Sequence, residues 1–172
     1  MNHSTIYESP FGKLKLFSNG KELTRILLPS QLSESDAGFT GNADRILQQA
    51  CDELESYFAG TRKEFEVANA PRKGTAFQRQ VWTELSSIPI GTTITYSELA
   101  IRVGRPSAVR AVGAANGRNE IPIIVPCHRV IGANGSLTGF AGGLDLKRQL
   151  LEHEKIHTSN RTSGVLRPGN KQ

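Results

Sequence analysis

Cysteine is scarce in this chain, since only Cys51 and Cys127 occur, far apart and without any repeating spacing. Two such residues cannot build the disulfide framework of a small secreted protein, so a reducing intracellular compartment is favoured. No apolar stretch approaches membrane-spanning length, and the first residues lack the basic and apolar regions of a signal peptide. We therefore expect a cytoplasmic protein with no membrane partner.

Acidic residues are outnumbered, with 16 Asp and Glu against 21 Lys and Arg, which gives a formal net charge of +5. This modest excess permits a polyanionic partner but does not require one. An apolar content of 37% with 22% charged residues indicates a globular protein and excludes a disordered one. A chain of 172 residues is long enough for one domain or two small ones.

The first part of the chain, residues 1–70, reads as an α/β domain. Apolar and polar residues alternate in its opening segment, and Asn19-Gly20 is a hairpin turn signal. Ile46, Ala50 and Leu54 recur at helical spacing. The expected elements are strands within 5–28, a loop over 30–41, a helix over 42–58 and a short strand over 64–67.

The pattern becomes mainly helical after a linker over 70–74, and residues 71–156 are expected to form a second domain. Thr75 and Gln78 match a capping box that opens a helix with Phe77 and Val81 on its inner face. The other expected elements are an extended segment over 92–96, a helix over 98–103 capped by Ser97, a helix over 108–116 and a helix over 144–154. Residues 157–172 are expected to be a disordered tail.

Two of these short helices, on either side of Gly104-Arg105-Pro106, have the form of a helix-turn-helix. The second consists largely of alanine, valine and glycine, with Arg110 as a conspicuous cation. Small residues allow a helix to approach a flat or grooved partner closely. They are equally suited to packing against another helix, with Arg110 merely solvated, and composition leaves both interpretations open.

The stretch 121–130 carries the most distinctive chemistry, because an apolar run between Pro122 and Pro126 leads directly to Cys127 and His128. A cysteine in apolar surroundings is normally inert and often only fills space. A neighbouring histidine can instead accept the thiol proton or stabilise the thiolate. These residues alone leave both interpretations open.

Two features after this stretch are candidates for a functional role, the loop 138–143 and Glu154. The glycine-rich loop 138–143 contains Phe140, which is either the aromatic wall of a lid or an anchor for a mobile connection. Glu154 stands at the expected C-terminal end of the last helix, where the helix dipole disfavours a negative charge. That position favours a specific partner for its carboxylate.

Pro126-Cys127-His128-Arg129-Val130 resembles the active-site signature of the O6-alkylguanine-DNA alkyltransferases (methylated-DNA–protein-cysteine methyltransferases). Further residues stand at the offsets from Cys127 that the family pattern expects: Tyr96, Arg110, Asn119, Gly142-Gly143, Lys147 and Glu154. The resemblance is specific from about Phe77 to Glu154 and loose before Pro71. It implies a ribonuclease-H-like α/β N-terminal domain and a mainly α C-terminal domain with a winged helix-turn-helix.

The resemblance also implies a role for each catalytic position. Cys127 takes the alkyl group from O6-alkylguanine in DNA, and from O4-alkylthymine, irreversibly and once per molecule. His128 is the base, acting through a water, and Glu154 orients and stabilises it. The Tyr96 hydroxyl supplies a proton to the departing guanine, and Asn119 holds the active-site turn.

The implied partner is double-stranded DNA, bound through the minor groove with the damaged nucleotide flipped out and Arg110 in its place. The other DNA-binding residues implied are Ser107, Ala108, Ala111 and Gly113. The residues implied for the substrate pocket are Val130, Phe140, Ala141 and Pro122. A monomer is expected, with cooperative assembly on DNA left open.

Three alternatives compete with this interpretation. A cysteine hydrolase could use Cys127 and His128, a lesion-recognition protein would lack the cysteine, and a transcription factor would not need the set of Cys127, His128 and Glu154. No cofactor is expected. No zinc site is expected either, because the N-terminal region offers only His3 and Cys51 as ligands.

Overall fold

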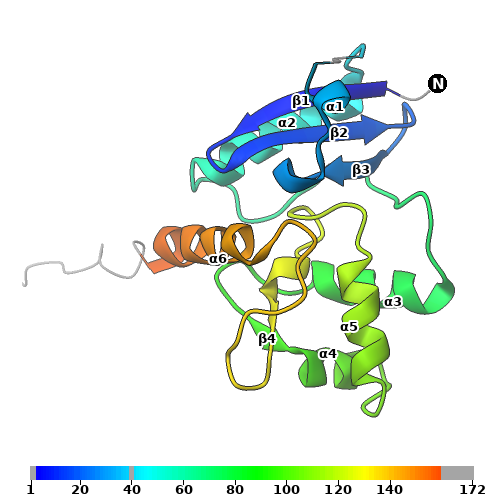
Figure 1. The fold of residues 1–172 in the computed structure, drawn as a ribbon, viewed down its shortest axis with the longest axis vertical. Coiled ribbons are helices and arrows are strands. Elements are labelled where there is room, and N and C mark those ends of the chain that lie inside the picture. Colours follow the sequence, from blue (N-terminus) through cyan, green and yellow to red (C-terminus); the bar gives the residue numbers. More distant parts are fainter. Residues whose placement is uncertain (1–2, 39–40, 160–172) are drawn as a thin grey trace, which may run out of the picture.

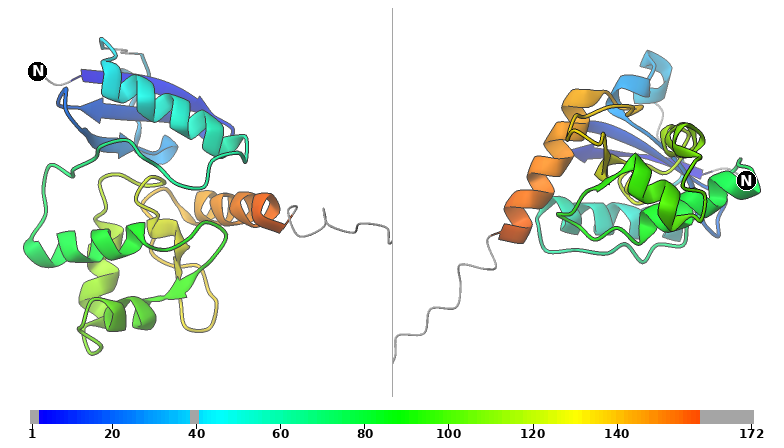
Figure 2. Two further views of the ribbon diagram at one scale, coloured as in Figure 1. Left: turned by 180° about the vertical axis from the view of Figure 1, so that it is seen from behind. Right: turned by 90° about the horizontal axis from the view of Figure 1, so that it is seen from below.

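The computed structural model describes residues 3–38 and 41–159, which form two units that lie against each other (Figure 1). The N-terminal unit comprises the described residues up to 70 and contains a sheet with a long helix. The C-terminal unit, from residue 71 onward, is mainly helical. Its last helix, α6 (Leu144–Ser159), lies along the junction between the two units (Figure 1 and the left view of Figure 2).

The N-terminal unit is a three-stranded antiparallel sheet in the order β1-β2-β3. Its strands are β1 (His3–Ser9), β2 (Gly12–Ser18) and β3 (Leu23–Leu27). Helix α2 (Arg45–Phe58) covers one face of the sheet (Figure 2) and buries Leu47, Ala50 and Leu54 against it. Asp44 caps this helix by accepting a hydrogen bond from the Leu47 backbone N–H at 2.8 Å. The expected helix is thus confirmed, with a start three residues later than the sequence suggested.

Two expectations for this unit were wrong. The predicted loop over 30–41 contains a 3-10 turn, η1 (Pro29–Gln31), and a short helix, α1 (Glu34–Gly38). The strand predicted over 64–67 is not formed, because the buried Glu53 carboxylate accepts the N–H groups of Glu66 and Val67 at 2.9 and 3.1 Å. The alternation of Phe65 and Val67 therefore reflects anchoring to α2 and not strand pairing.

The C-terminal unit begins with α3 (Ala76–Ser86), and the Thr75–Gln78 capping box predicted for it is present. Helices α4 (Tyr96–Arg102) and α5 (Val109–Gly117) follow, joined by a tight turn. Helix α4 is capped by Thr95 and not by Ser97, because Thr95 and Glu98 form a second capping box. Strand β4 (Ile94–Thr95) pairs in parallel with β5 (Val130–Ile131), which follows the 3-10 turn η2 (Cys127–Arg129).

Helix α6 is longer than the sequence predicted. It continues to Ser159, so the expectation of disorder was wrong for residues 157–159, and residues 160–172 lie outside the described part of the chain. Glu154 consequently sits inside the helix, and the dipole argument for its needing a partner does not hold. Within the described residues, no helix is long and apolar enough to cross a bilayer.

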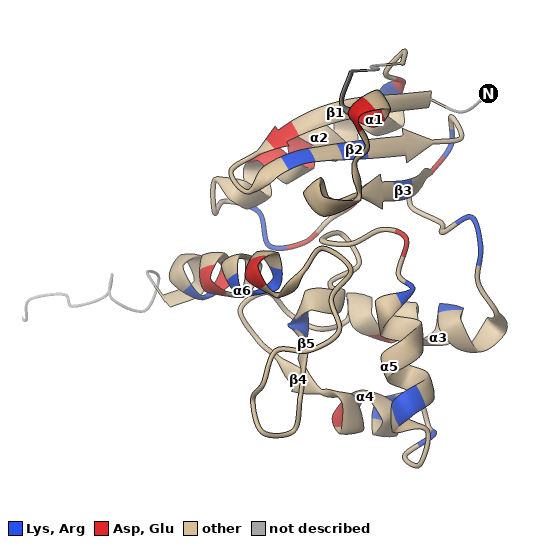
Figure 3. Ribbon diagram, viewed as in Figure 1, with Lys and Arg blue, Asp and Glu red and all other residues tan. Residues whose placement is uncertain are grey.

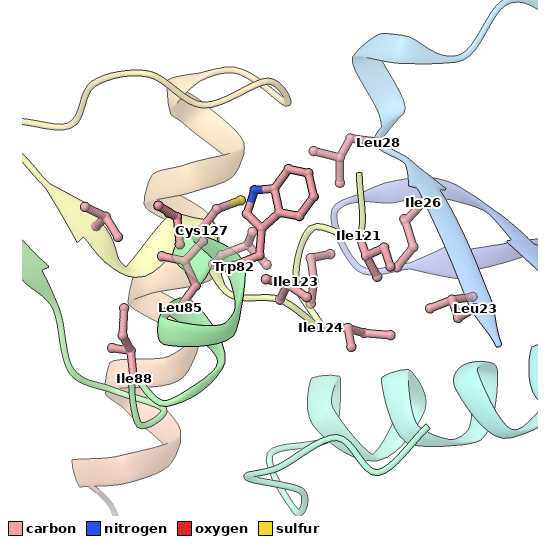
Figure 4. Packing of buried hydrophobic residues seen from close by; sticks show 14 of the residues in the cluster. Leu23, Ile26, Leu28, Trp82, Leu85, Ile88, Ile121, Ile123, Ile124 and Cys127 are labelled. Atoms are coloured by element: carbon pink, nitrogen blue, oxygen red, sulfur yellow. The ribbon is translucent and has the colours of Figure 1, made fainter. Parts of the chain in front are cut away.

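The apolar core is continuous through both units, and the segment 121–125 is its centre (Figure 4). Ile121, Ile123 and Ile124 lie between side chains of α3 on one side and of the β3 region on the other. A backbone hydrogen bond of 2.9 Å from the Ile26 N–H to the Glu120 carbonyl joins the units at the start of this segment. The segment before Cys127 is therefore held from both sides.

Trp82 ties α3 to α5 and provides a test of this packing. Its indole Nε1–H donates to the Ala115 carbonyl at 2.8 Å in a buried environment. We expect Trp82→Phe to lower the free energy of unfolding by about 1–3 kcal/mol, because the Ala115 carbonyl loses one of its two donors and the smaller ring leaves a gap in the core. Urea unfolding followed by far-UV circular dichroism measures this. The exposed Thr83→Ala on the same helix should stay within about 0.5 kcal/mol of wild type, and equal midpoints for both variants would contradict the argument.

Candidate active site

The turn that precedes Cys127 is closed by the side chain of Asn119. Its Nδ2 donates to the Val125 carbonyl at 2.7 Å, and its Oδ1 accepts the Ile121 N–H at 3.0 Å. Between these points Ile123 adopts a φ of 75°, a left-handed conformation that is costly for a β-branched residue. Every residue from 121 to 130 is buried. Asn119 and burial together hold a backbone that local propensity alone would not form.

Cys127 lies at the first position of η2, with its side chain only 5% exposed. Burial raises the pKa of the thiol, while a hydrogen bond from Asn119 and the charge of Lys147 partly oppose this rise. The resting side chain is therefore a protonated thiol at neutral pH, and a base is needed to make it a nucleophile.

His128 and Glu154 form a fully buried pair, with the histidine Nε2 2.6 Å from Oε1 of the carboxylate. Burial lowers the pKa of His128 more than the charge of Glu154 raises it. Burial alone would raise the pKa of Glu154, but His128 and Arg129 more than offset this, and the net pKa lies well below its usual range. The stable state at neutral pH is therefore a neutral imidazole that donates Nε2–H to an ionised carboxylate.

This protonation state leaves Nδ1 of His128 as the basic nitrogen, and among the described residues it has no hydrogen-bond partner. No hydrogen bond joins the Cys127 sulfur to this nitrogen in the described part of the chain. The two groups are adjacent in sequence but do not form a direct pair. The arrangement provides a buried, oriented base whose free nitrogen can accept one proton.

The Glu154 carboxylate is held by four donors besides the histidine nitrogen, all from residues far away in the sequence. Arg129 donates Nε–H to Oε2 and Nη2–H to Oε1, each at 2.9 Å. The Tyr57 hydroxyl donates to Oε1 at 2.8 Å, and the Gly91 backbone N–H donates to Oε2 at 3.2 Å. These hydrogen bonds therefore offset the free-energy cost of removing the Glu154 charge from water.

Tyr96 and Lys147 attach the glycine-rich loop to the site. The Tyr96 hydroxyl donates to the Thr138 carbonyl at 3.0 Å, and Lys147 Nζ donates to the carbonyls of Thr138 and Val130 at 2.8 and 2.6 Å. Burial lowers the pKa of the Lys147 amine to about 8, and it raises the pKa of the Tyr96 phenol. The Tyr96 hydroxyl is thus protonated at neutral pH and can donate a hydrogen bond.

A surface hollow of about 300 Å³ opens between α4, α5 and this loop, and Tyr96, Arg110, Gly113 and Gly139 line it. Gly113 faces the Tyr96 ring, which a Cβ atom there would meet at 3.7 Å. Gly113 therefore belongs as much to the wall of this hollow as to the outer face of α5.

None of the four residues predicted for the substrate pocket is among those that line this hollow. Val130 is fully buried, and Phe140 is half-buried against the core. Pro122 and Ala141 line a different cavity of about 180 Å³, which faces β3. Two of the predicted pocket residues thus belong to the apolar core and two to this second cavity, and the structure does not bring the four together.

The outer face of α5 is exposed, small and basic. Arg110, Ala111 and Ala114 are exposed, whereas Val112 and Ala115 face the core. The interpretation that the small residues pack against another helix is therefore wrong for Ala111 and Ala114 but correct for Ala115, which is buried against α3. Ser107 is also exposed, and Ala108 is half-buried at the start of the helix. Basic segments recur on α4, α5 and the turn between them (Figure 3).

Three residues of this site were not predicted from the sequence. Arg129 belongs to the pentapeptide 126–130, but the sequence did not indicate its role. In the structure it binds the same Glu154 carboxylate as His128. Asn116 donates to the Cys127 carbonyl at 3.3 Å and is buried. No local sequence pattern indicates that Tyr57 contacts the site, because it lies 97 residues before Glu154 and on the other unit. Among the described residues, no three His, Cys, Asp or Glu side chains are grouped to hold a metal ion.

Family comparisons match both parts of the chain. A family model for "6-O-methylguanine DNA methyltransferase, ribonuclease-like domain" matches residues 2–70, and one for its "DNA binding domain" matches residues 76–156. The expected combination of a ribonuclease-like N-terminal domain with a DNA-binding C-terminal domain is thereby confirmed.

Several curated relatives are named methylated-DNA–protein-cysteine methyltransferase. That of Mycobacterium tuberculosis is 46% identical over 155 residues, which cover 90% of this chain and 93% of the relative. That of Methanosarcina acetivorans is 48% identical over 151 residues, which cover 87% and 96%. The crystal structure of the M. tuberculosis O6-methylguanine methyltransferase has a TM-score of 0.81 at 46% identity, covering 91% of this chain and 94% of the other. A structure of that organism's OGT in complex with DNA has a TM-score of 0.79 at 45% identity, covering 90% and 94%.

The charge of Glu154 provides a test of the site's electrostatics. We expect Glu154→Gln to lower the free energy of unfolding by about 3–5 kcal/mol at neutral pH, because Arg129 is left buried and unpaired. The pKa of the carboxyl is lowered on folding from its ordinary value of 4.5, so its contribution is present above that pH. It is lost as the pH falls toward the folded-state pKa.

Urea unfolding at a series of pH values measures this difference, and the gap between wild type and Glu154→Gln should narrow in acid. The exposed Glu152→Gln on the same helix is the matched control and should leave stability nearly unchanged. A gap that stays constant down to strongly acidic pH would show that the carboxylate charge does not stabilise the site.

Proposed function

Because this chain belongs to the 6-O-methylguanine DNA methyltransferase family, we propose that it repairs alkylated DNA by transferring the alkyl group from guanine O6 to its own Cys127. The observation that carries this proposal is the buried His128–Glu154 pair with its free Nδ1, adjacent in sequence to a protonated thiol. A thiolate is a soft nucleophile suited to an alkyl carbon. O4-alkylthymine also carries an alkyl group on an exocyclic oxygen, so we extend the proposal to this lesion.

In the proposed reaction, a water carries the Cys127 proton to Nδ1 of His128, and the resulting imidazolium is stabilised by the ionised Glu154. The sulfur then attacks the alkyl carbon, a C–S bond forms, and the C–O bond to guanine breaks with its electron pair going to O6. Tyr96, which is held neutral by burial, donates its proton to a ring nitrogen of the guanine. The proton that His128 took from the thiol then returns through water to the Tyr96 oxygen, so both groups end in their resting protonation states. The products are unmodified guanine and S-alkylcysteine.

The proposed reaction is a single turnover. A thioether has no acidic hydrogen on sulfur and no polarised carbonyl, so the acid–base groups beside Cys127 offer no route for cleaving it. Each molecule would therefore act once, and the amount repaired would equal the amount of active protein.

The attacked atom lies inside a base pair, so the nucleotide must leave the stack before transfer. The exposed face of α5 carries Ala111 and Ala114, which would let the helix approach the floor of the minor groove. Arg110 projects from that face at the edge of the hollow beside Tyr96 and would occupy the space left by the flipped base. Helices α4 and α5 would act as the helix-turn-helix of a cytoplasmic monomer.

Covalent modification of Cys127 is the central prediction. After incubation with an oligonucleotide that contains O6-methylguanine, the peptide bearing Cys127 should gain the mass of one methylene, in a ratio of one per active molecule. Peptide mapping by mass spectrometry measures this gain. Cys127→Ser should abolish repair, while Cys51→Ser, which changes the other free thiol, should preserve it. Repair by Cys127→Ser, or hydrolytic turnover of an ester with no loss of thiol, would favour a different enzyme.

Arg110 should matter for duplex DNA and much less for a free base. We expect Arg110→Ala to slow repair of a duplex by at least roughly tenfold, because the flipped state loses its stabilising cation. The rate of transfer from free O6-benzylguanine should change little. Arg148→Ala, which removes an exposed arginine of α6, is the matched control. Equal losses toward both substrates would contradict the assignment of Arg110 to base extrusion.

A further inference from the structure

We infer that Tyr57 of the N-terminal unit is a positioning residue for alkyl transfer, because its hydroxyl holds the carboxylate that orients His128. The inference rests on the proposed function and adds a component that the Cys127–His128–Glu154 set lacks. By this inference the N-terminal unit completes the active site instead of only supporting it.

The contact is direct and well buried. The Tyr57 hydroxyl donates to Oε1 of Glu154 at 2.8 Å, and this is the same oxygen that accepts from His128 at 2.6 Å. Tyr57 is 1% exposed and Glu154 is fully buried, so no water competes for the bond. Loss of a donor to a buried charge costs more than loss of a bond at the surface.

The phenol has little freedom to move away. Its ring packs against Phe58, Phe65 and His153, with centroids 5.0, 5.4 and 5.2 Å away. A second bond fixes its backbone, because Nε2 of His153 donates to the Tyr57 carbonyl at 3.0 Å. His153 immediately precedes Glu154 on α6, so the end of α2 holds α6 through both a side chain and a backbone group.

The hydroxyl is a permanent donor. Burial and the neighbouring Glu154 raise the pKa of Tyr57 well above its ordinary value, so the phenol stays protonated wherever the protein is folded. It therefore draws part of the carboxylate charge toward itself at every working pH. Removal of this donor concentrates the charge on the bond to His128, which stabilises the imidazolium and raises the pKa of His128.

The experiment compares full-length wild type, Tyr57→Phe and Tyr7→Phe. Tyr57→Phe keeps the ring and its aromatic contacts and removes only the hydroxyl. Tyr7→Phe is the matched control, because Tyr7 stacks on Phe58 in the same cluster at 6.2 Å. The readout is the rate of benzyl transfer from free O6-benzylguanine to Cys127, followed by mass spectrometry between about pH 4 and 9, since burial lowers the pKa of His128 below its ordinary value.

We expect Tyr57→Phe to react roughly tenfold more slowly at neutral pH, because the carboxylate is less well oriented. The acid limb of its rate profile should move upward by about half a pH unit or more, since His128 must be neutral to accept the thiol proton. Tyr7→Phe should match wild type in both respects. A Tyr57→Phe profile that coincides with that of wild type overturns the inference.

A merely structural role would also overturn it. In that case the rate would fall only in proportion to the unfolded fraction, which urea titration measures, and the pH profile would stay in place. If Tyr57→Phe does not fold, 3-fluorotyrosine at position 57 keeps the shape and gives a stronger donor. The acid limb should then move downward, and an unmoved limb removes the inference.

Failure of the proposed function gives a different result. If wild type takes no benzyl group, the rate at which iodoacetamide modifies Cys127 still reports activation of the thiol by His128. The same comparison of Tyr57→Phe with Tyr7→Phe then decides the question. A shared profile for the two variants overturns the assignment of Tyr57, whatever the natural substrate.

Discussion

The buried charge of Glu154 is the constraint on which the rest of this structure depends. An isolated carboxylate in a protein interior costs several kcal/mol, and breaking a buried pair costs about 3–5 kcal/mol. The compensating donors come from the end of α2, from the loop before β4 and from η2. These elements must therefore meet at one point of α6. Satisfying this one ion therefore constrains the relative placement of the two units, which the continuous apolar core also joins, and the position of η2 with Cys127.

Burial shifts the pKa values of the two groups proposed to react, Cys127 and His128, in opposite directions. It keeps the Cys127 thiol protonated and His128 neutral, so the resting site holds a weak nucleophile beside an available base. Glu154 makes this base useful, because an ionised partner stabilises the imidazolium only after the proton arrives. In the proposed single-turnover reaction, an unactivated thiol would protect the protein, since it would limit loss of the cysteine to other electrophiles before DNA is bound.

Local patterns predicted the parts of this fold that local energetics control. The helix periodicity ending at Phe58 and the Thr75–Gln78 capping box were both found in place. The strand expected over 64–67 failed, because the Glu53 carboxylate competes for its N–H groups across the chain. The extent of α6 and the partners of Glu154 depend on the packing of two units, and no spacing in the sequence encodes a contact such as Tyr57–Glu154.

The apolar run before Cys127 stabilises a strained turn, which its composition alone did not reveal. Ile123 sits at a φ of 75°, which for a β-branched residue costs about 1–3 kcal/mol. Full burial of an isoleucine stabilises by about 1.5–3 kcal/mol, and Ile121, Ile123 and Ile124 are all buried between the two units. This burial offsets the strain and holds the turn that Asn119 closes. A polar segment could not maintain that turn, and Cys127, which directly follows it, would lose its fixed position.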